Sequence, residues 1–191
     1  MAVYTKINKE NISYINKKFN IEKFISFKGI KQGIENTNYL LKTKKRKFIL
    51  TIFEKRVSNR ELPFFMKLME VLNNSKINCP RPIKNNEGNY LFKLKNKKAC
   101  IVTYLDGQDK KILNNKNCYD IGKIIARIHL ITKNIRISRK NSMGINNLDR
   151  LLKSIRFKKK EFHNLEKFLK MNLKDIKKKW PKLLPKGIIH G

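Results

Sequence analysis

The sequence is poor in acidic residues and cysteine and has no long apolar run. Its 191 residues include 14 Asp or Glu against 46 Lys or Arg, a formal net charge of +32. Cys79, Cys100 and Cys118 lie far apart and form no Cys-x-x-Cys pair, which argues against a disulfide framework and a zinc site. No apolar run approaches the roughly 18 residues of a membrane helix, and no signal peptide is recognisable. We therefore expect a cytoplasmic protein with no membrane partner.

The strong positive charge raises the question of nucleic-acid binding, because basic surfaces gain free energy on phosphate backbones. The lysines are spread over turns, helices and loops, however, without interleaved aromatics or a recognised nucleic-acid motif. Enrichment in Lys, Asn and Ile together is also typical of AT-rich codons. We expect no specific nucleic-acid partner, although a basic nucleic-acid-binding module stays as an alternative. The hydrophobic content of 40% suffices for a folded core, and the sequence does not indicate an oligomeric state.

The first part of the chain has the pattern of a small antiparallel sheet with helices. Periodicity predicts a helix over residues 8–19, strands over 21–28 and 48–53 with an apolar run at 39–41 between them, a helix over 61–74, and strands over 90–94 and 99–105. After Asp106-Gly107 only helices are predicted, a buried one over 119–132 with Asn117 as N-cap and others over 148–157 and 162–180. We therefore expect a boundary near residue 106 between a β-rich lobe (1–106) and a helical lobe (107–191).

Two features of the β-rich part suit a phosphate-bearing nucleotide. Gly29 and Gly33 lie in a turn whose backbone could approach phosphate oxygens, and Lys55 or Lys28 could supply a positive charge beside it. The last strand of this lobe would offer backbone groups to a purine base at Thr103, Tyr104 and Leu105.

Taken together, the segments resemble the bacterial homoserine kinase family of the aminoglycoside-phosphotransferase type. The matching segments are Ala2-Val3-Tyr4-Thr5, residues 26–30 and 33–41, residues 48–56, Leu62-Pro63-Phe64-Phe65, Cys79-Pro80-Arg81-Pro82, residues 101–107, residues 141–144, Trp180-Pro181 and residues 184–191. The resemblance covers the whole chain and rests on the order and spacing of these segments. It implies an α+β, two-lobed protein-kinase-like fold with an antiparallel sheet in the N-lobe and a truncated helical C-lobe.

The resemblance also implies an activity. Family members transfer the γ-phosphoryl group of ATP, with Mg2+, to the side-chain hydroxyl of L-homoserine, giving O-phospho-L-homoserine for threonine biosynthesis. His190 matches the family histidine that supports the catalytic loop, and the catalytic Asp would follow Gly191, so we expect the chain as it stands to be inactive and to fold poorly. A choline or aminoglycoside kinase of the same fold is the nearest alternative.

The resemblance also indicates which residues would form the site. We expect the nucleotide to be bound by Gly29, Gly33, Asn36, Asn38, Thr51, Lys55, Thr103, Tyr104 and Leu105. Thr51 stands where many relatives of this fold have a phosphate-pairing Lys or Arg, and Lys55 is either its replacement or a solvated surface residue. Glu61 or Glu70 could partner such a lysine, although a surface role is favoured for both. Asn141 and Gly144 could border the acceptor site, and no metal ligand is assigned.

Overall fold

The computed structural model describes residues 3–55, 57–141, 144–155, 162–181, 183 and 187–189. By contacts the chain divides into two compact units, Met1–Ile137 with Ile188–Gly191, and Ser138–Gly187. Each unit is described by itself below. Among the helices of the described residues, none is long and apolar enough to cross a membrane.

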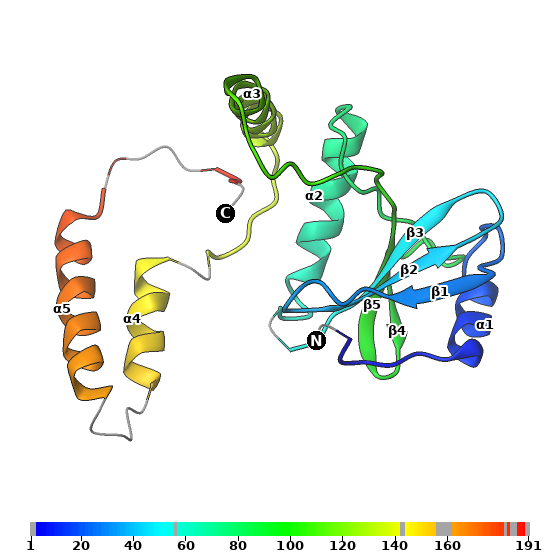
Figure 1. Ribbon diagram of the computed structural model, residues 1–191, viewed down its shortest axis with the longest axis horizontal. Coiled ribbons are helices and arrows are strands. Elements are labelled where there is room, and N and C mark those ends of the chain that lie inside the picture. Colours follow the sequence, from blue (N-terminus) through cyan, green and yellow to red (C-terminus); the bar gives the residue numbers. More distant parts are fainter. Residues whose placement is uncertain are drawn as a thin grey trace. The chain divides into compact units, whose positions relative to one another are not determined.

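The first unit contains a five-stranded antiparallel sheet with the order β1-β2-β3-β5-β4 (Figure 1). Its strands are β1 (Ser26–Gly29), β2 (Thr37–Lys42), β3 (Lys47–Ile52), β4 (Leu91–Leu94) and β5 (Lys97–Thr103). Buried residues alternate with half-exposed ones along β2 and β3, as expected where one face of a strand is covered more fully than the other. The antiparallel sheet and the α+β fold predicted from the sequence are confirmed.

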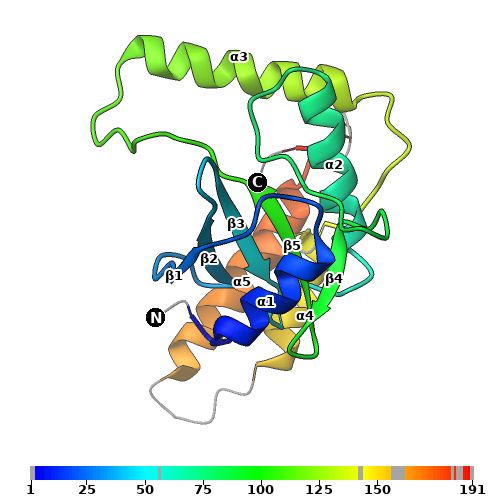
Figure 2. The same ribbon diagram turned by 90° about the vertical axis from the view of Figure 1, so that its right-hand side faces the viewer.

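The two faces of the sheet are covered by different helices (Figure 2). On the core face, Leu41, Leu50 and Ile101 are completely buried in one cluster with Ile12 and Ile15 of helix α1 (Lys9–Lys18). On the opposite face, which we call the α2 face, Cys100 and Val102 pack with Met66 of helix α2 (Leu62–Asn74). The α2 cluster is the smaller of the two, and part of the α2 face stays accessible.

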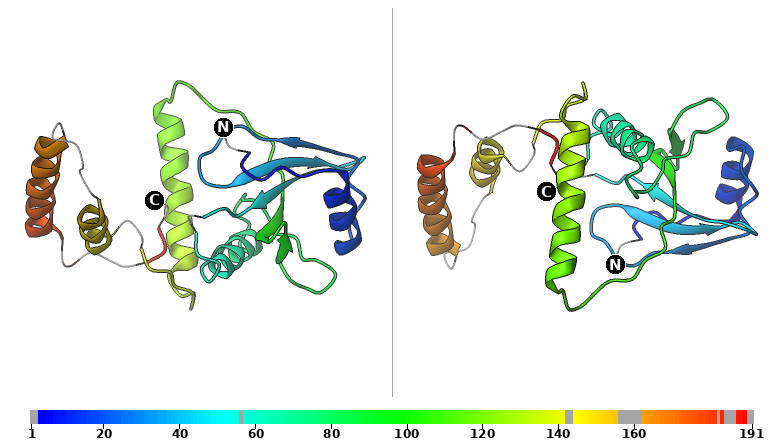
Figure 3. Two further views of the ribbon diagram at one scale, coloured as in Figure 1. Left: turned by 90° about the horizontal axis from the view of Figure 1, so that it is seen from below. Right: turned by 90° about the horizontal axis from the view of Figure 1, so that it is seen from above.

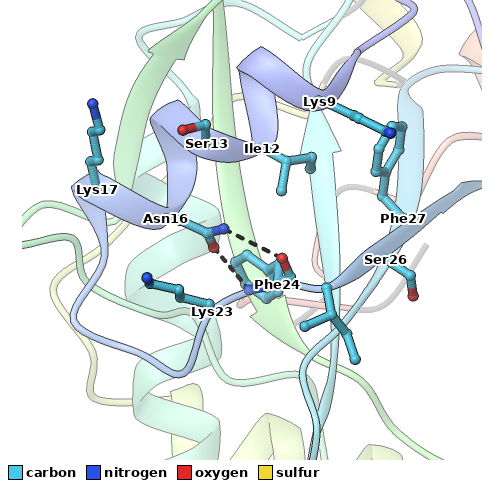
Figure 4. Close-up of a pocket in the computed structure, with 10 residues that line it drawn as sticks. Lys9, Ile12, Ser13, Asn16, Lys17, Lys23, Phe24, Ser26 and Phe27 are labelled. Atoms are coloured by element: carbon cyan, nitrogen blue, oxygen red, sulfur yellow. Dashed lines mark hydrogen bonds between the residues drawn. The ribbon is translucent and has the colours of Figure 1, made fainter.

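The strand predicted over residues 21–28 is shorter than expected, because β1 begins only at Ser26. The side chain of Asn16 in α1 explains the late start (Figure 4). Its Nδ2 donates to the carbonyl oxygen of Phe24 at 3.3 Å, and its Oδ1 accepts from the amide of Phe24 at 2.9 Å. A side chain thus takes both backbone groups that a strand would have paired.

Helix α3 (Asn115–Thr132; Figure 3) forms where a helix was predicted. It differs from the prediction in two ways. Its N-cap is Asn114, whose side chain accepts from the amide of Asn117; Asn117 is the third residue of the helix and completes a capping box. The expected burial of its isoleucine face is not seen within the described residues, where Ile121 and Ile124 are each 48% exposed and Ile125 is 37% exposed.

The second unit contains two helices, α4 (Ile145–Ser154) and α5 (His163–Lys179). Asp149 of α4 pairs with Lys153 in the same helix at 3.1 Å and with Lys177 of α5 at 2.9 Å. These ion pairs lower the pKa of Asp149, the hydrogen bond from Lys177 contributing most. The helices predicted over 148–157 and 162–180 are therefore present, although residues 156 and 157 lie outside the described part.

Candidate nucleotide site

The accessible part of the α2 face lies on β2 and β3. Asn38 and Leu40 of β2 are half-buried, as are Thr51 and Ile49 of β3, and the register pairs Asn38 with Thr51 and Leu40 with Ile49. Their neighbours in each strand point to the core face and are buried. The result is a strip with two apolar and two polar side chains, a combination suited to a flat ring with a polar substituent.

A glycine turn (residues 30–36) connects β1 to β2 beside this strip. The turn is closed by a hydrogen bond from the amide of Ile30 to the carbonyl oxygen of Asn38 at 2.9 Å. Gly33 has φ +107°, a conformation that other residues rarely adopt, and a Cβ there would have no atom within 4 Å. Residues 31–35 are exposed, so their backbone is accessible to a ligand.

The structure assigns packing or hydrogen-bonding roles to several residues predicted to bind the nucleotide. A Cβ at Gly29 would lie 3.0 Å from Cγ2 of Val3, so this glycine allows the N-terminal residues to pack against β1. The Oδ1 of Asn36 accepts from the amide of Glu54 at 3.3 Å, and the Oδ1 of Asn38 accepts from the hydroxyl of Thr51 at 2.8 Å. Among described residues the Nδ2 of Asn38 has no recorded acceptor, so Asn38 keeps a donor for a ligand.

The two candidate lysines are both exposed. Lys28 lies on β1 opposite Leu40, on the α2 face, whereas Lys55 follows β3 beyond Glu54. Strand β3 ends at Ile52, so the alternation that would carry Lys55 onto the face of Thr51 does not continue to it. Lys28 is therefore the lysine that the sheet places beside the strip.

Glu70, one of the two candidate partners for such a lysine, is engaged elsewhere. It accepts from Nζ of Lys67 at 2.8 Å and from the hydroxyl of Tyr90 at 2.6 Å, and the bond from Lys67 contributes most to lowering its pKa. Burial and this carboxylate raise the pKa of Tyr90 to about 12. Glu70 thus joins α2 to the start of β4, whereas Glu61 occupies the N-cap position of α2 without a capping hydrogen bond from its side chain.

The predicted purine-binding segment already uses part of its backbone. The amide of Thr103 donates to the carbonyl oxygen of Arg81 at 2.9 Å, and the amide of Tyr104 donates to that of Lys47 at 3.2 Å. Within the described residues, the amide of Leu105 donates no hydrogen bond to another backbone group. Leu105 is therefore the donor in this segment that a base could use.

The remaining predicted residues belong to other parts of the chain. Asn141 and Gly144 lie in the second unit, where the carbonyl oxygen of Asn141 accepts from the amide of Gly144 at 3.2 Å and from Nδ2 of Asn147 at 2.8 Å. His190 lies outside the described residues. The roles of all three stay predictions.

A pocket of about 600 Å³ lies between α1 and the start of β1 (Figure 4). Its lining includes Ile12, Phe24 and Phe27, which belong to or pack against the core-face cluster, together with Lys9 and Lys23. No residue of the glycine turn or of the strip lines it. We therefore do not place the nucleotide there.

Sequence reasoning missed the residue with the most extensive polar contacts near the turn, Glu54. Its carboxylate accepts hydrogen bonds from Thr5, Thr37 and Lys97. An acidic residue directly after a buried strand, in a chain with so few acids, was the available signal. The resemblance at residues 48–56 included Glu54 without giving it a role.

Sequence similarity to known proteins extends over the whole chain. A model described as "Phosphotransferase enzyme family" matches residues 26–191. A homoserine kinase of Parvibaculum lavamentivorans is 34% identical over 192 residues, and one of Bradyrhizobium diazoefficiens is 36% identical over 193 residues. These alignments cover 100% of this chain but 60% and 59% of the two relatives, so the chain spans about three fifths of their length.

The fold comparison agrees with the sequence comparison. A spectinomycin phosphotransferase solved with ADP and spectinomycin superposes with a TM-score of 0.61 at 14% identity, over 95% of this chain and 60% of that one. At this identity the likeness concerns the fold, and it confirms the predicted kinase-like architecture. With a family model that matches residues 26–191, the chain belongs to the phosphotransferase enzyme family.

Proposed function

We propose that the protein containing these residues is a homoserine kinase, which transfers the γ-phosphoryl group of ATP to the side-chain hydroxyl of L-homoserine. The observation that carries the proposal is the 34 to 36% identity to homoserine kinases along the whole chain. The product would be O-phospho-L-homoserine, and the enzyme would be cytoplasmic.

The geometry supports a nucleotide in the first unit. The glycine turn offers an accessible backbone, Lys28 offers a charge on the adjacent strand, and Leu105 offers an amide at the far end of the same sheet. Leu40 and Ile49, the two apolar residues of the strip, would contact the purine ring. Backbone groups and apolar contacts bind a purine without charged side chains. The positive charge toward the phosphates that Thr51 does not supply would come from Lys28.

The magnesium ion that this reaction uses has no site that we can assign. Within the described residues there is no group of three or more His, Cys, Asp or Glu side chains placed to hold a metal. The carboxylate of Glu54 beside the turn does not fit either, because it is already bonded to Lys97 and two threonines. No step of the reaction is therefore derived through the metal.

The activity is tested with the protein expressed from the complete open reading frame that encodes these residues. We expect ATP-dependent formation of O-phosphohomoserine, detected by mass spectrometry, at a kcat/KM at least about tenfold above those for choline and spectinomycin. A preference for choline or spectinomycin would replace the proposal by the corresponding small-molecule kinase. Salt-dependent DNA binding without phosphorylation of any alcohol would support the nucleic-acid alternative.

A further inference from the structure

One carboxylate joins several segments behind the glycine turn. Glu54 follows β3, and its side chain is 10% exposed. Its Oε1 accepts from the hydroxyls of Thr5 and Thr37, each at 2.7 Å. Its Oε2 forms an ion pair with Lys97 at the start of β5.

The same polar cluster binds the N-terminal segment (residues 3–7). The hydroxyl oxygen of Thr37 accepts from the amides of Tyr4 and Thr5, both at 3.0 Å. Nζ of Lys97 donates to the hydroxyl of Thr5 at 2.8 Å. Thr5 and Thr37 are buried, and each hydroxyl both donates and accepts hydrogen bonds, so the cluster fixes this segment against the ends of β2, β3 and β5.

The cluster and the N-terminal segment contact the glycine turn at two places and the residue before it at a third. The amide of Glu54 donates to Asn36 at the end of the turn, and the hydroxyl of Tyr4 donates to the carbonyl oxygen of Ile34 at 2.8 Å. Val3 packs against Gly29 just before the turn, where a Cβ would be 3.0 Å away. These contacts come from the core side of the sheet and leave residues 31–33 accessible.

The glycine turn is largely open to solvent. Residues 31–35 are exposed, and the space beside Gly33 is empty to 4 Å. A loop that must present amides to phosphates at fixed positions loses affinity if it has to be ordered on binding. Support from behind is therefore the feature that would pre-organise it.

We propose that Glu54 is a positioning residue for the glycine turn and that the N-terminal segment, held by Glu54, Thr37 and Lys97, is a structural part of the nucleotide site. Neither contacts the nucleotide; both fix the turn that does. The expected effect on nucleotide affinity rests on the proposed function. The expected effect on amide hydrogen exchange in the turn does not, because it can be measured without a nucleotide.

The test compares Glu54→Gln and Thr5→Val with two matched controls in the protein expressed from the complete open reading frame that encodes these residues. Glu87→Gln removes a carboxylate that pairs with Lys18 at 2.8 Å away from the turn, and Thr43→Val removes a buried hydroxyl from the β2–β3 turn. ADP affinity is measured by calorimetry and amide hydrogen exchange of residues 30–36 by mass spectrometry. We expect both test variants to bind ADP about tenfold more weakly and to exchange faster in the turn, with both controls unchanged.

The outcomes separate the inference from the proposed function. If the parent chain does not bind ADP, the proposed function fails for this site, but faster exchange in Glu54→Gln than in Glu87→Gln still supports the positioning role. Parent-like affinity and exchange in both test variants would overturn the inference. If Glu54→Gln does not fold, Thr5→Val and the shorter carboxylate of Glu54→Asp give the same comparison, with partial recovery expected in Glu54→Asp.

Discussion

Gly33 is the residue of the turn whose backbone most clearly requires glycine. Replacement by valine puts a branched side chain at φ +107°, which costs on the order of 1–2 kcal/mol in the native turn. The space around Gly33 is open, so the valine side chain can be accommodated if the backbone of the turn changes conformation. We expect this distortion to lower the affinity for ADP, measured by calorimetry, about tenfold.

Gly88 provides the control for this substitution. It has φ +79° and equally open surroundings, in the loop formed by Asn85 and Asn89 before β4. Gly88→Val should lose comparable stability without losing affinity for ADP. Equal affinity losses in the two variants would show that general destabilisation, and not the turn, is responsible.

The ionisation of Glu54 gives a pH prediction. Burial by itself would raise its pKa, but the hydrogen bonds from Lys97, Thr37 and Thr5 outweigh that effect and hold the pKa below its ordinary value of 4.5. A pKa lowered by folding stabilises the native state above the unfolded pKa, and this contribution is lost as the pH falls through the folded value. The difference in unfolding free energy between the parent and Glu54→Gln should therefore be constant near neutral pH and shrink below about pH 4.5, as measured by urea denaturation. A difference that grows in acid would contradict the ionised cluster.

The side chains near the turn show what the sequence could and could not indicate. Gly33 was predictable, because a glycine between two strand-like segments marks a special backbone conformation. The internal bonds of Asn36 and Asn38 were not, since turn-forming and ligand-binding asparagines look alike in a sequence. The role of Glu54 depends on Thr5 and Lys97, 49 and 43 positions away, and no local pattern reports such a meeting.

At the scale of elements, strands and helices with strong periodicity were predicted well, and errors occurred where a side chain replaced a backbone partner. The register of β2 on β3 follows from buried residues at every second position. The late start of β1 depends on Asn16, and the first turn of α3 depends on the pairing of Asn114 with Asn117. Such side-chain bonds to the backbone have no periodicity, so the ends of elements were less predictable than their centres.

The role of Asn16 is itself testable. Asn16→Ala removes both bonds to the partly buried backbone of Phe24, which should lower the unfolding free energy by about 1–3 kcal/mol in urea denaturation. Asn20→Ala, at an exposed position just after α1, is the control and should change it by less than about 0.5 kcal/mol. A loss within that smaller range for Asn16→Ala would mean that water replaces these bonds without cost.

At the scale of the whole molecule, an apolar face of α3 is exposed in the described structure. Ile121 and Ile124 are each 48% exposed in the described structure. We expect the 191-residue chain to bind the dye ANS and to associate at high concentration, and Ile124→Glu to reduce both without lowering Tm. Ile101→Ala, at a completely buried position, should instead lower the unfolding free energy by 2–5 kcal/mol as a rough range. A lower Tm in Ile124→Glu would show that this face is covered in solution.

The glycine turn and the α2 face of the sheet form the proposed nucleotide site. Its most direct test is amide hydrogen exchange in the protein expressed from the complete open reading frame, with and without saturating ADP. We expect slower exchange with ADP in residues 30–36 and at Leu105, with no change in α1 or in residues 23–25 beside the pocket of Figure 4. Protection confined to that pocket, or none at any concentration of ADP, would contradict the proposed site.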